Sequence, residues 1–137
     1  MNERILALDI GDVRIGIAVS DPSRTIAAPL EVLRRVGWGP DTRYIKALCD
    51  KYETTQVLSG LPLNMDGSEG FQAQKVRSFC AQLEKAGLTV IFQDERLTTV
   101  VAEDALLEDN MSRADRKKTV DKIAAAVILQ QWLDEQK

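Results

Sequence analysis

The sequence contains no histidine. This absence removes the commonest general base and the commonest zinc ligand, so a metal site in this chain would have to use carboxylate oxygens. Only two cysteines are present, Cys49 and Cys80, and they form no CxxC pair. We therefore expect reduced thiols in the core of a cytoplasmic protein.

Long apolar runs and a strong excess of one charge are also missing. No apolar run approaches the roughly 18 residues of a membrane span, so no membrane partner is expected. The net charge of −3 argues against non-specific coating of nucleic acid, but it leaves room for a local binding patch. The 137 residues, of which 45% are hydrophobic, are expected to form a single domain over residues 1–137.

Apolar runs and turn signals predict an α/β chain. Strands are expected at residues 5–10, 15–20 and 25–34, with a Gly11-Asp12 hairpin turn between the first two. Pro29 places the third strand at a sheet edge, because proline cannot donate to the strand ladder. Two buried strands, at 56–60 and 88–93, follow. A meander followed by strand–helix alternation predicts a mixed five-stranded sheet flanked by helices, with the first, fourth and fifth strands parallel.

Helices are expected at residues 41–52, from a Ser68 cap to a stop at Gly87, at 99–110 and at 119–135. The apolar face of the first should carry Tyr44, Ile45, Leu48 and Cys49, and that of the second should carry Gln72, Val76, Phe79, Cys80 and Leu83. Trp38 lies in a glycine-flanked loop before the first helix. We expect it to pack against the sheet edge, with base stacking as the alternative.

One carboxylate, Asp9, is set into the apolar run of the first strand. An ionised carboxylate in a buried strand is unfavourable unless something pairs with it. Either Asp9 lies at the strand end and reaches water, or it holds a cation.

Two further acidic residues are candidates for the same place. Glu95 lies just past a predicted parallel strand, at the edge where open α/β sheets bind ligands. Asp121 lies on the apolar face of the last helix. Each residue could instead have a purely structural role. Glu95 could pair with Arg96, and Asp121 could cap its helix or pair with a neighbouring lysine. If Asp9, Glu95 and Asp121 converge, a hard divalent cation such as Mg²⁺ or Mn²⁺ would relieve their repulsion, and phosphodiester hydrolysis is the chemistry that such sites perform.

A basic stretch lies beside Asp121. It is formed by Arg113, Arg116, Lys117, Lys118 and Lys122. A run of this kind is either a solvated face or, beside a phosphodiesterase site, a patch that binds the nucleic-acid backbone. We favour the second interpretation.

Four motifs in order resemble those of the YqgF family, and the resemblance covers essentially the whole chain. They are Leu8-Asp9-Ile10-Gly11 with the following stretch from Arg14 to Asp21, Gly60 to Gly67, Asp94 to Thr99, and Asp121 to Ala125. The resemblance implies an RNase H-like fold, and the family is described as Holliday-junction resolvases or pre-16S rRNA nucleases. One departure is Asp12-Val13, where the family commonly has a hydroxyl or small residue and then lysine, and it could weaken a phosphate contact.

Carried over by position, the family's acidic triad falls on Asp9, Glu95 and Asp121. The resemblance also implies that Arg14 and Arg96 position phosphates or orient the carboxylates, and that the loop with Asn64 flanks the scissile strand. The expected protein is an endonuclease that uses Mg²⁺ or Mn²⁺ on structured RNA, in processing the 5′ end of pre-16S rRNA on ribosomal precursor particles.

Three alternatives stay open. The chain could be a resolvase that cuts four-way DNA junctions, or a non-catalytic ribosome-assembly module that binds nucleic acid. Asp9-Ile10-Gly11 with Gly16 also resembles the phosphate loop of actin-like and sugar kinases, although the length suffices for only one of their two domains. Nothing in the sequence identifies a dimer surface, so the oligomeric state is open.

Overall fold

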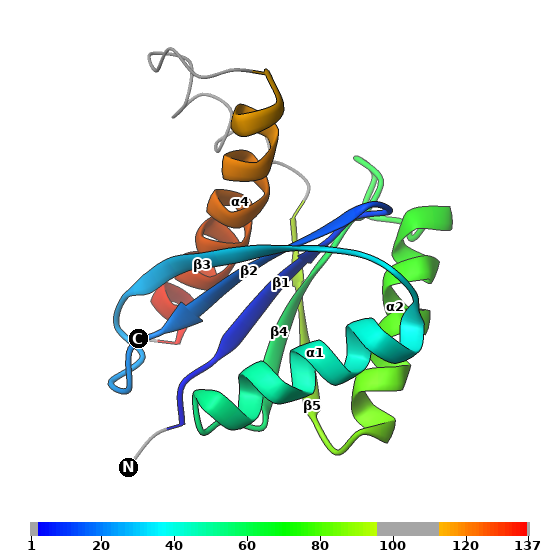
Figure 1. Cartoon of the computed structure of the whole chain (residues 1–137). Coiled ribbons are helices and arrows are strands. Elements are labelled where there is room, and N and C mark those ends of the chain that lie inside the picture. Colours follow the sequence, from blue (N-terminus) through cyan, green and yellow to red (C-terminus); the bar gives the residue numbers. More distant parts are fainter. Residues whose placement is uncertain (1–2, 96–112, 137) are drawn as a thin grey trace.

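The computed structural model describes residues 3–95 and 113–136, with the side chains of 3–95 and 120–136 (Figure 1). Its five strands are β1 (Leu6–Ile10), β2 (Arg14–Ser20), β3 (Ala27–Arg34), β4 (Gln56–Leu61) and β5 (Thr89–Asp94). They form one sheet in the order β3-β2-β1-β4-β5. The first three strands are antiparallel neighbours, whereas β1, β4 and β5 are parallel. The predicted mixed sheet, with the proline-containing strand at its edge, is confirmed.

Helices cover both faces of this sheet. Figure 1 shows α4 (Arg113–Glu135) on one face and α1 (Trp38–Lys51) with α2 (Phe71–Lys85) on the other. Successive residues of a strand point to opposite faces, and β1 accordingly supplies both cores. Leu6 and Leu8 pack with the α1 and α2 side chains, while Ala7 packs with α4, as does Ile5 just before the strand. A buried apolar strand such as β1 therefore contributes to two separate cores.

The start of α1 differs from the prediction. The helix begins at Trp38, three residues before Asp41, and Pro40 fits its first turn because no helical N–H bond is needed there. Asp41 is buried inside the helix and accepts hydrogen bonds from the Val36 N–H (3.1 Å) and the Arg35 Nε (3.3 Å). The prediction that Tyr44 faces the core is wrong: its side chain is exposed and donates a hydrogen bond to Glu31.

The start of α2 also differs. Gly70 precedes the helix without a side-chain cap, so the predicted Ser68 cap is wrong, and Ser68 instead hydrogen-bonds Asp66. Gln72 is exposed, and Ala73 takes its predicted place on the apolar face. The predicted stop at Gly87 is confirmed, since this residue has a φ of 98°, which favours glycine.

The last helix is longer than expected, because it begins at Arg113 rather than near 119. Asp121 therefore lies well inside α4, which excludes the alternative that it caps the helix. The helix predicted at 99–110 lies outside the described residues.

Cys49 and Cys80 are buried free thiols, as predicted, and burial raises the pKa of each to about 11. No helix within the described ranges is long and apolar enough to cross a membrane.

Contact between α4 and the sheet depends on Gly16 in β2. A β-carbon at this position would lie 1.9 Å from the backbone carbonyl oxygen of Asp121, far inside van der Waals contact. Glycine within a strand commonly marks such a close approach of another backbone. The absent side chain of Gly16 thus fixes how closely α4 can pack.

Gly16→Ala is expected to destabilise the protein, because the new methyl group would push the α4 backbone away from β2. Overpacking of a core typically costs about 1–3 kcal/mol, and this contact is at the severe end. Urea unfolding should show the loss as a lower midpoint. Gly39→Ala is the matched control, since its nearest neighbour is the end of the Arg43 side chain at 3.3 Å and alanine suits its place in α1, so its midpoint should not fall. An unchanged midpoint for Gly16→Ala would contradict this account of the packing.

Candidate functional site

Asp9 and Asp121 lie on the same side of the sheet because of Gly16. Asp9 is the direct partner of Gly16 in the β1–β2 pair, so the two residues share a face. The α4 backbone at Asp121 packs against Gly16 on that face. The Asp121 charge is near enough to act on the Asp9 carboxyl.

Glu95 is brought to the same place by a second glycine. It follows β5, and its N–H donates to the Leu61 carbonyl at 3.3 Å. A β-carbon on Gly60 would lie 2.3 Å from Oε2 of Glu95, so the Glu95 carboxyl occupies the space that a side chain at position 60 would fill. There the partly buried Glu95 carboxyl forms a hydrogen bond with Asp9.

The Asp9–Glu95 pair is electrostatically unfavourable when both groups are charged. Burial and the neighbouring Asp9 carboxylate raise the pKa of Glu95 to about 9. Burial raises the pKa of Asp9 as well, and Asp121 adds to the rise, while the hydrogen bond from Glu95 opposes it. At neutral pH Glu95 is therefore protonated, and its carboxyl is hydrogen-bonded to that of Asp9.

Asp121 is engaged differently. Its Oδ2 accepts a hydrogen bond from Nε of Arg14 at 2.8 Å, and both side chains are about one-fifth exposed. Within the described part of the chain, no three carboxylate or thiol side chains are arranged to hold a metal ion. The structure thus joins Asp9 to Glu95 and leaves Asp121 nearby, held by Arg14.

The Asp9–Glu95 pair suits a hard divalent cation in its chemistry. Its donors are oxygens, and a cation bound between them would relieve the repulsion that helps to raise the pKa of Glu95. Mg²⁺ is commonly bound through only one or two carboxylates, with water and substrate phosphates completing its shell. Two converging carboxylates are therefore a sufficient protein contribution, and Asp121 is positioned to join them if Arg14 releases it.

The other predicted binding residues are more dispersed. Asn64 lies in an exposed turn, where it donates to Ser68 Oγ at 3.0 Å. Lys122 is partly buried on α4. Arg113, Arg116, Lys117 and Lys118 belong to the first turns of α4, and their side chains, like all of Arg96, lie outside the described residues.

Sequence reasoning missed the structural importance of three residues. Gly60 creates the room for the Glu95 carboxyl and Gly16 the room for the α4 backbone at Asp121, and glycine inside a strand was the available signal. Arg34 is the direct partner of Arg14 across β2 and β3 and is exposed on the same face. No side chain of residues 3–95 or 120–136 pairs with Arg34. Arg34 therefore adds a positive charge beside Arg14, whose own charge is paired with Asp121.

Comparisons with known proteins agree on the kind of protein. A family model described as "RuvX: Holliday junction resolvase" matches residues 3–135. A protein of Clostridium botulinum named "Putative pre-16S rRNA nuclease" is 50% identical over 132 residues, which is 96% of both chains. A protein of Clostridium kluyveri with the same name is 48% identical over the same share.

Solved structures share the fold at low sequence identity. T. thermophilus RuvC in complex with a Holliday junction substrate is 14% identical with a TM-score of 0.60, covering 98% of this chain and 96% of that one. The fowlpox virus resolvase with Holliday junction DNA is also 14% identical, with a TM-score of 0.55, covering 97% and 98%. The RNase H-like fold expected from the sequence is confirmed.

Glu95→Gln is expected to stabilise the protein at neutral and alkaline pH when divalent cations are absent. Because the pKa of Glu95 is raised from 4.5 to about 9, the folded state binds more protons than the unfolded state between these values. The contribution of Glu95 to the free energy of unfolding is therefore fully present below pH 4.5, and it is lost as the pH rises toward about 9. The amide removes this loss, and a gain of about 1 kcal/mol is typical of relieving strain at a functional site.

The measurement is urea unfolding of both proteins from acid to about pH 9 in a chelating buffer. Glu69→Gln is the matched control, because the pKa of Glu69 is lowered by its hydrogen bond with Arg77, and its removal should bring no gain. Equal stability of Glu95→Gln and the parent protein across this range would contradict the raised pKa of Glu95.

Proposed function

The chain belongs to the RuvX (YqgF) family, and from this premise we propose that it is a divalent-metal-dependent endonuclease that processes the 5′ end of pre-16S rRNA. It hydrolyses phosphodiester bonds, as the nuclease names of its relatives state for them. The proposal is carried by one observation: two partly buried carboxyls, Asp9 and Glu95, are hydrogen-bonded to each other beside Asp121. These carboxyls lie at the edge of the sheet where the parallel strands end.

In the proposed mechanism, Asp9 and Glu95 would hold a divalent cation in place of the proton between them, and Asp121 would serve as a third ligand or as an outer one. Such a cation supplies an activated water and neutralises charge on the attacked phosphate. Gly60 leaves space for the Glu95 carboxyl, and Gly16 lets the α4 backbone at Asp121 approach the sheet. Arg14 orients Asp121 through its Nε and holds it until substrate arrives.

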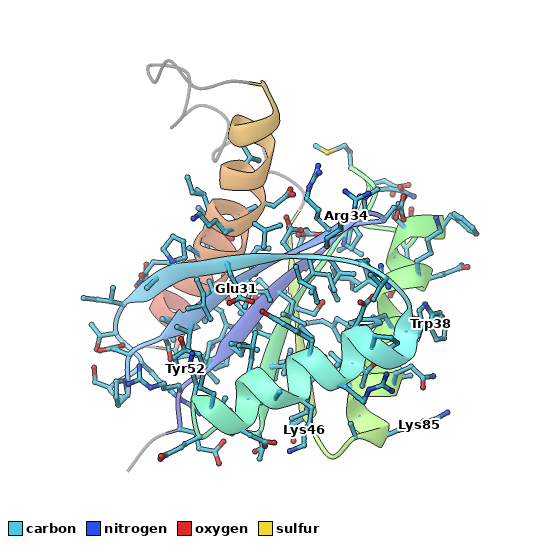
Figure 2. All side chains as sticks on the ribbon, in the orientation of Figure 1. Glu31, Arg34, Trp38, Lys46, Tyr52 and Lys85 are labelled. Atoms are coloured by element: carbon cyan, nitrogen blue, oxygen red, sulfur yellow. The ribbon has the colours of Figure 1, made fainter. Side chains whose placement is uncertain are left out.

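Arg34 extends this site toward the substrate. It lies at the end of β3, directly across from Arg14, and its exposed guanidinium adds a positive charge beside the acidic residues that a phosphate can contact. Figure 2 labels Arg34 near the turn between β1 and β2, far from Lys85 at the other end of α2. We assign Arg34 a role in binding the nucleic-acid backbone.

A second candidate function is resolution of four-way DNA junctions. The matching family model carries that description, and the RuvC and fowlpox structures contain junction DNA. Resolvases cut symmetrically and generally act as dimers, so this function would need paired active sites. A cleavage assay that offers both pre-16S rRNA and a four-way DNA junction separates the two functions.

Asp9→Asn is expected to abolish cleavage of a pre-16S rRNA fragment in Mg²⁺ or Mn²⁺ while the protein stays folded. Loss of an outer-shell partner alone commonly lowers metal affinity or activity about 10- to 100-fold, so loss of a direct ligand should cost more. Gel analysis of the precursor fragment and of a four-way DNA junction, in parallel, measures it.

Asp50→Asn is the control for this assay, since Asp50 is an exposed carboxylate that pairs with Lys46 on α1. It should cut at the parental rate. Full activity of Asp9→Asn would refute the proposed site. Binding of RNA without cleavage by the parent protein in either metal would favour the non-catalytic assembly module.

Arg34→Gln is expected to weaken RNA binding through loss of one phosphate contact. The slope of log affinity against log salt should fall by about 1, independent of RNA sequence. Filter binding in chelating buffer, over a salt series, measures it without cleavage. Lys85→Gln removes an exposed positive charge at the far end of α2 and should leave the slope unchanged. Equal slopes for the two variants would exclude Arg34 from the interface.

A further inference from the structure

A hollow of about 570 Å³ lies between the beginning of α1 and the beginning of α2. Its lining includes Trp38 from α1, Phe71 and Lys75 from α2, and Asp12 from the turn between β1 and β2. Figure 1 places these helices on the face of the sheet opposite α4. The hollow is therefore separate from the acidic site, which lies on the α4 face.

Two large aromatic side chains at this hollow are exposed. Trp38 is 51% exposed and Phe71 is 72% exposed, although the expectation for Trp38 was packing against the sheet. They come from two different helices and border one space. Exposed aromatic side chains gathered around a hollow are typical of a stacking surface for flat ring systems, including nucleobases of every sequence.

The charges around the hollow suit a base that carries a phosphate. The ammonium of Lys75 lies 4.6 Å from the centre of the Phe71 ring and 3.3 Å from Asp12 Oδ1. Both members of this ion pair are about half exposed, and such surface pairs contribute little to stability. Lys75 is thus available to exchange Asp12 for a phosphate. Arg35, by contrast, is tied to the buried Asp41 and lies over Phe79, which makes it part of the wall.

The hollow is also near the acidic site along the chain. Asp12 is three residues past Asp9, in the turn that directly follows β1. Phe71 follows the loop that leaves β4, the strand that holds Gly60 beneath Glu95. Both sites therefore lie at the edge where the parallel strands end, on opposite faces of the sheet. A polynucleotide strand that crosses this edge can occupy both.

We propose that the hollow between Trp38 and Phe71 binds an unpaired base of the substrate strand, with Lys75 contacting the adjoining phosphate. This subsite deepens the proposed nuclease function and rests on it. It gives the enzyme a preference for substrates in which a single-stranded segment adjoins a duplex. A hollow that recognises a base by stacking, with one mobile cation, selects unpaired structure rather than sequence.

The test compares two RNA hairpins with the same stem, one blunt and one with a short single-stranded extension, in chelating buffer without cleavage. Trp38→Ala and Phe71→Ala should each weaken binding of the extended hairpin about 5- to 150-fold, the range of base–aromatic stacking, and leave the blunt hairpin unaffected. Trp38→Phe should retain most of the affinity. Tyr44→Ala, which removes an exposed aromatic elsewhere on α1, should change neither.

A second measurement needs no variant in the hollow. The chain has two tryptophans, and Trp132→Phe leaves Trp38 as the remaining one. The extended hairpin should quench its fluorescence, and the blunt hairpin should not. If free AMP quenches as strongly as the extended hairpin, the hollow is a mononucleotide site and the proposal is wrong.

Two further outcomes overturn the proposal. One is equal binding of both hairpins by the parent protein and by the Trp38 and Phe71 variants. The other is a dimer of the parent protein in sedimentation that Trp38→Ala dissociates, which would make the hollow an interface between two copies. If the protein cleaves pre-16S rRNA but the extension has no effect on binding, the subsite is refuted and the nuclease function stands. If the extension strengthens binding but no cleavage occurs in Mg²⁺ or Mn²⁺, the subsite stands and the nuclease function is refuted.

Discussion

The hydrogen bond between two partly buried carboxyls, Asp9 and Glu95, is the interaction around which the candidate site is organised. Glu95 and Asp9 are in contact only because Gly60 has no side chain to separate Glu95 from the sheet. Asp121 is close to them only because Gly16 admits the α4 backbone. The fold thus places glycines, which have no side chain to pack, in two strands, and it gathers three acidic residues at one place. Carboxyl groups gathered at one place, with raised pKa values, are characteristic of a site maintained for chemistry.

The arrangement of strands was predictable because it follows from local signals. The hairpin turn after Ile10, the proline in β3 and the apolar runs of β1, β4 and β5 fix the pairing and the edge. The helix starts were not predictable, because tertiary contacts decide them. Asp41, a typical helix-starting residue, instead satisfies Arg35 and the Val36 backbone from inside α1. Tyr44 leaves the apolar face for a hydrogen bond with Glu31, on another element.

The candidate site was predictable in its members and not in its contacts. A lone acid in an apolar strand, an acid past a parallel strand and an acid on an apolar helix face each stand out by pattern. The contacts among these acids depend on the space left by Gly16 and Gly60. That space can be located only once the register of β1 against β2 and the path of α4 are known. The Arg14–Asp121 pair joins residues far apart in the chain, so no local pattern announces it.

Arg14 explains how the acidic site can be tolerated before a cation or a substrate binds. Of the three carboxylates, Asp121 is compensated by a guanidinium and the other two by a proton. Each compensation is reversible: the proton can leave, and Arg14 can turn to a phosphate, with Arg34 beside it. A negatively charged substrate and a divalent cation would therefore replace both compensations together, and each would favour binding of the other. The pairings that stabilise the free protein are also those that substrate binding exchanges.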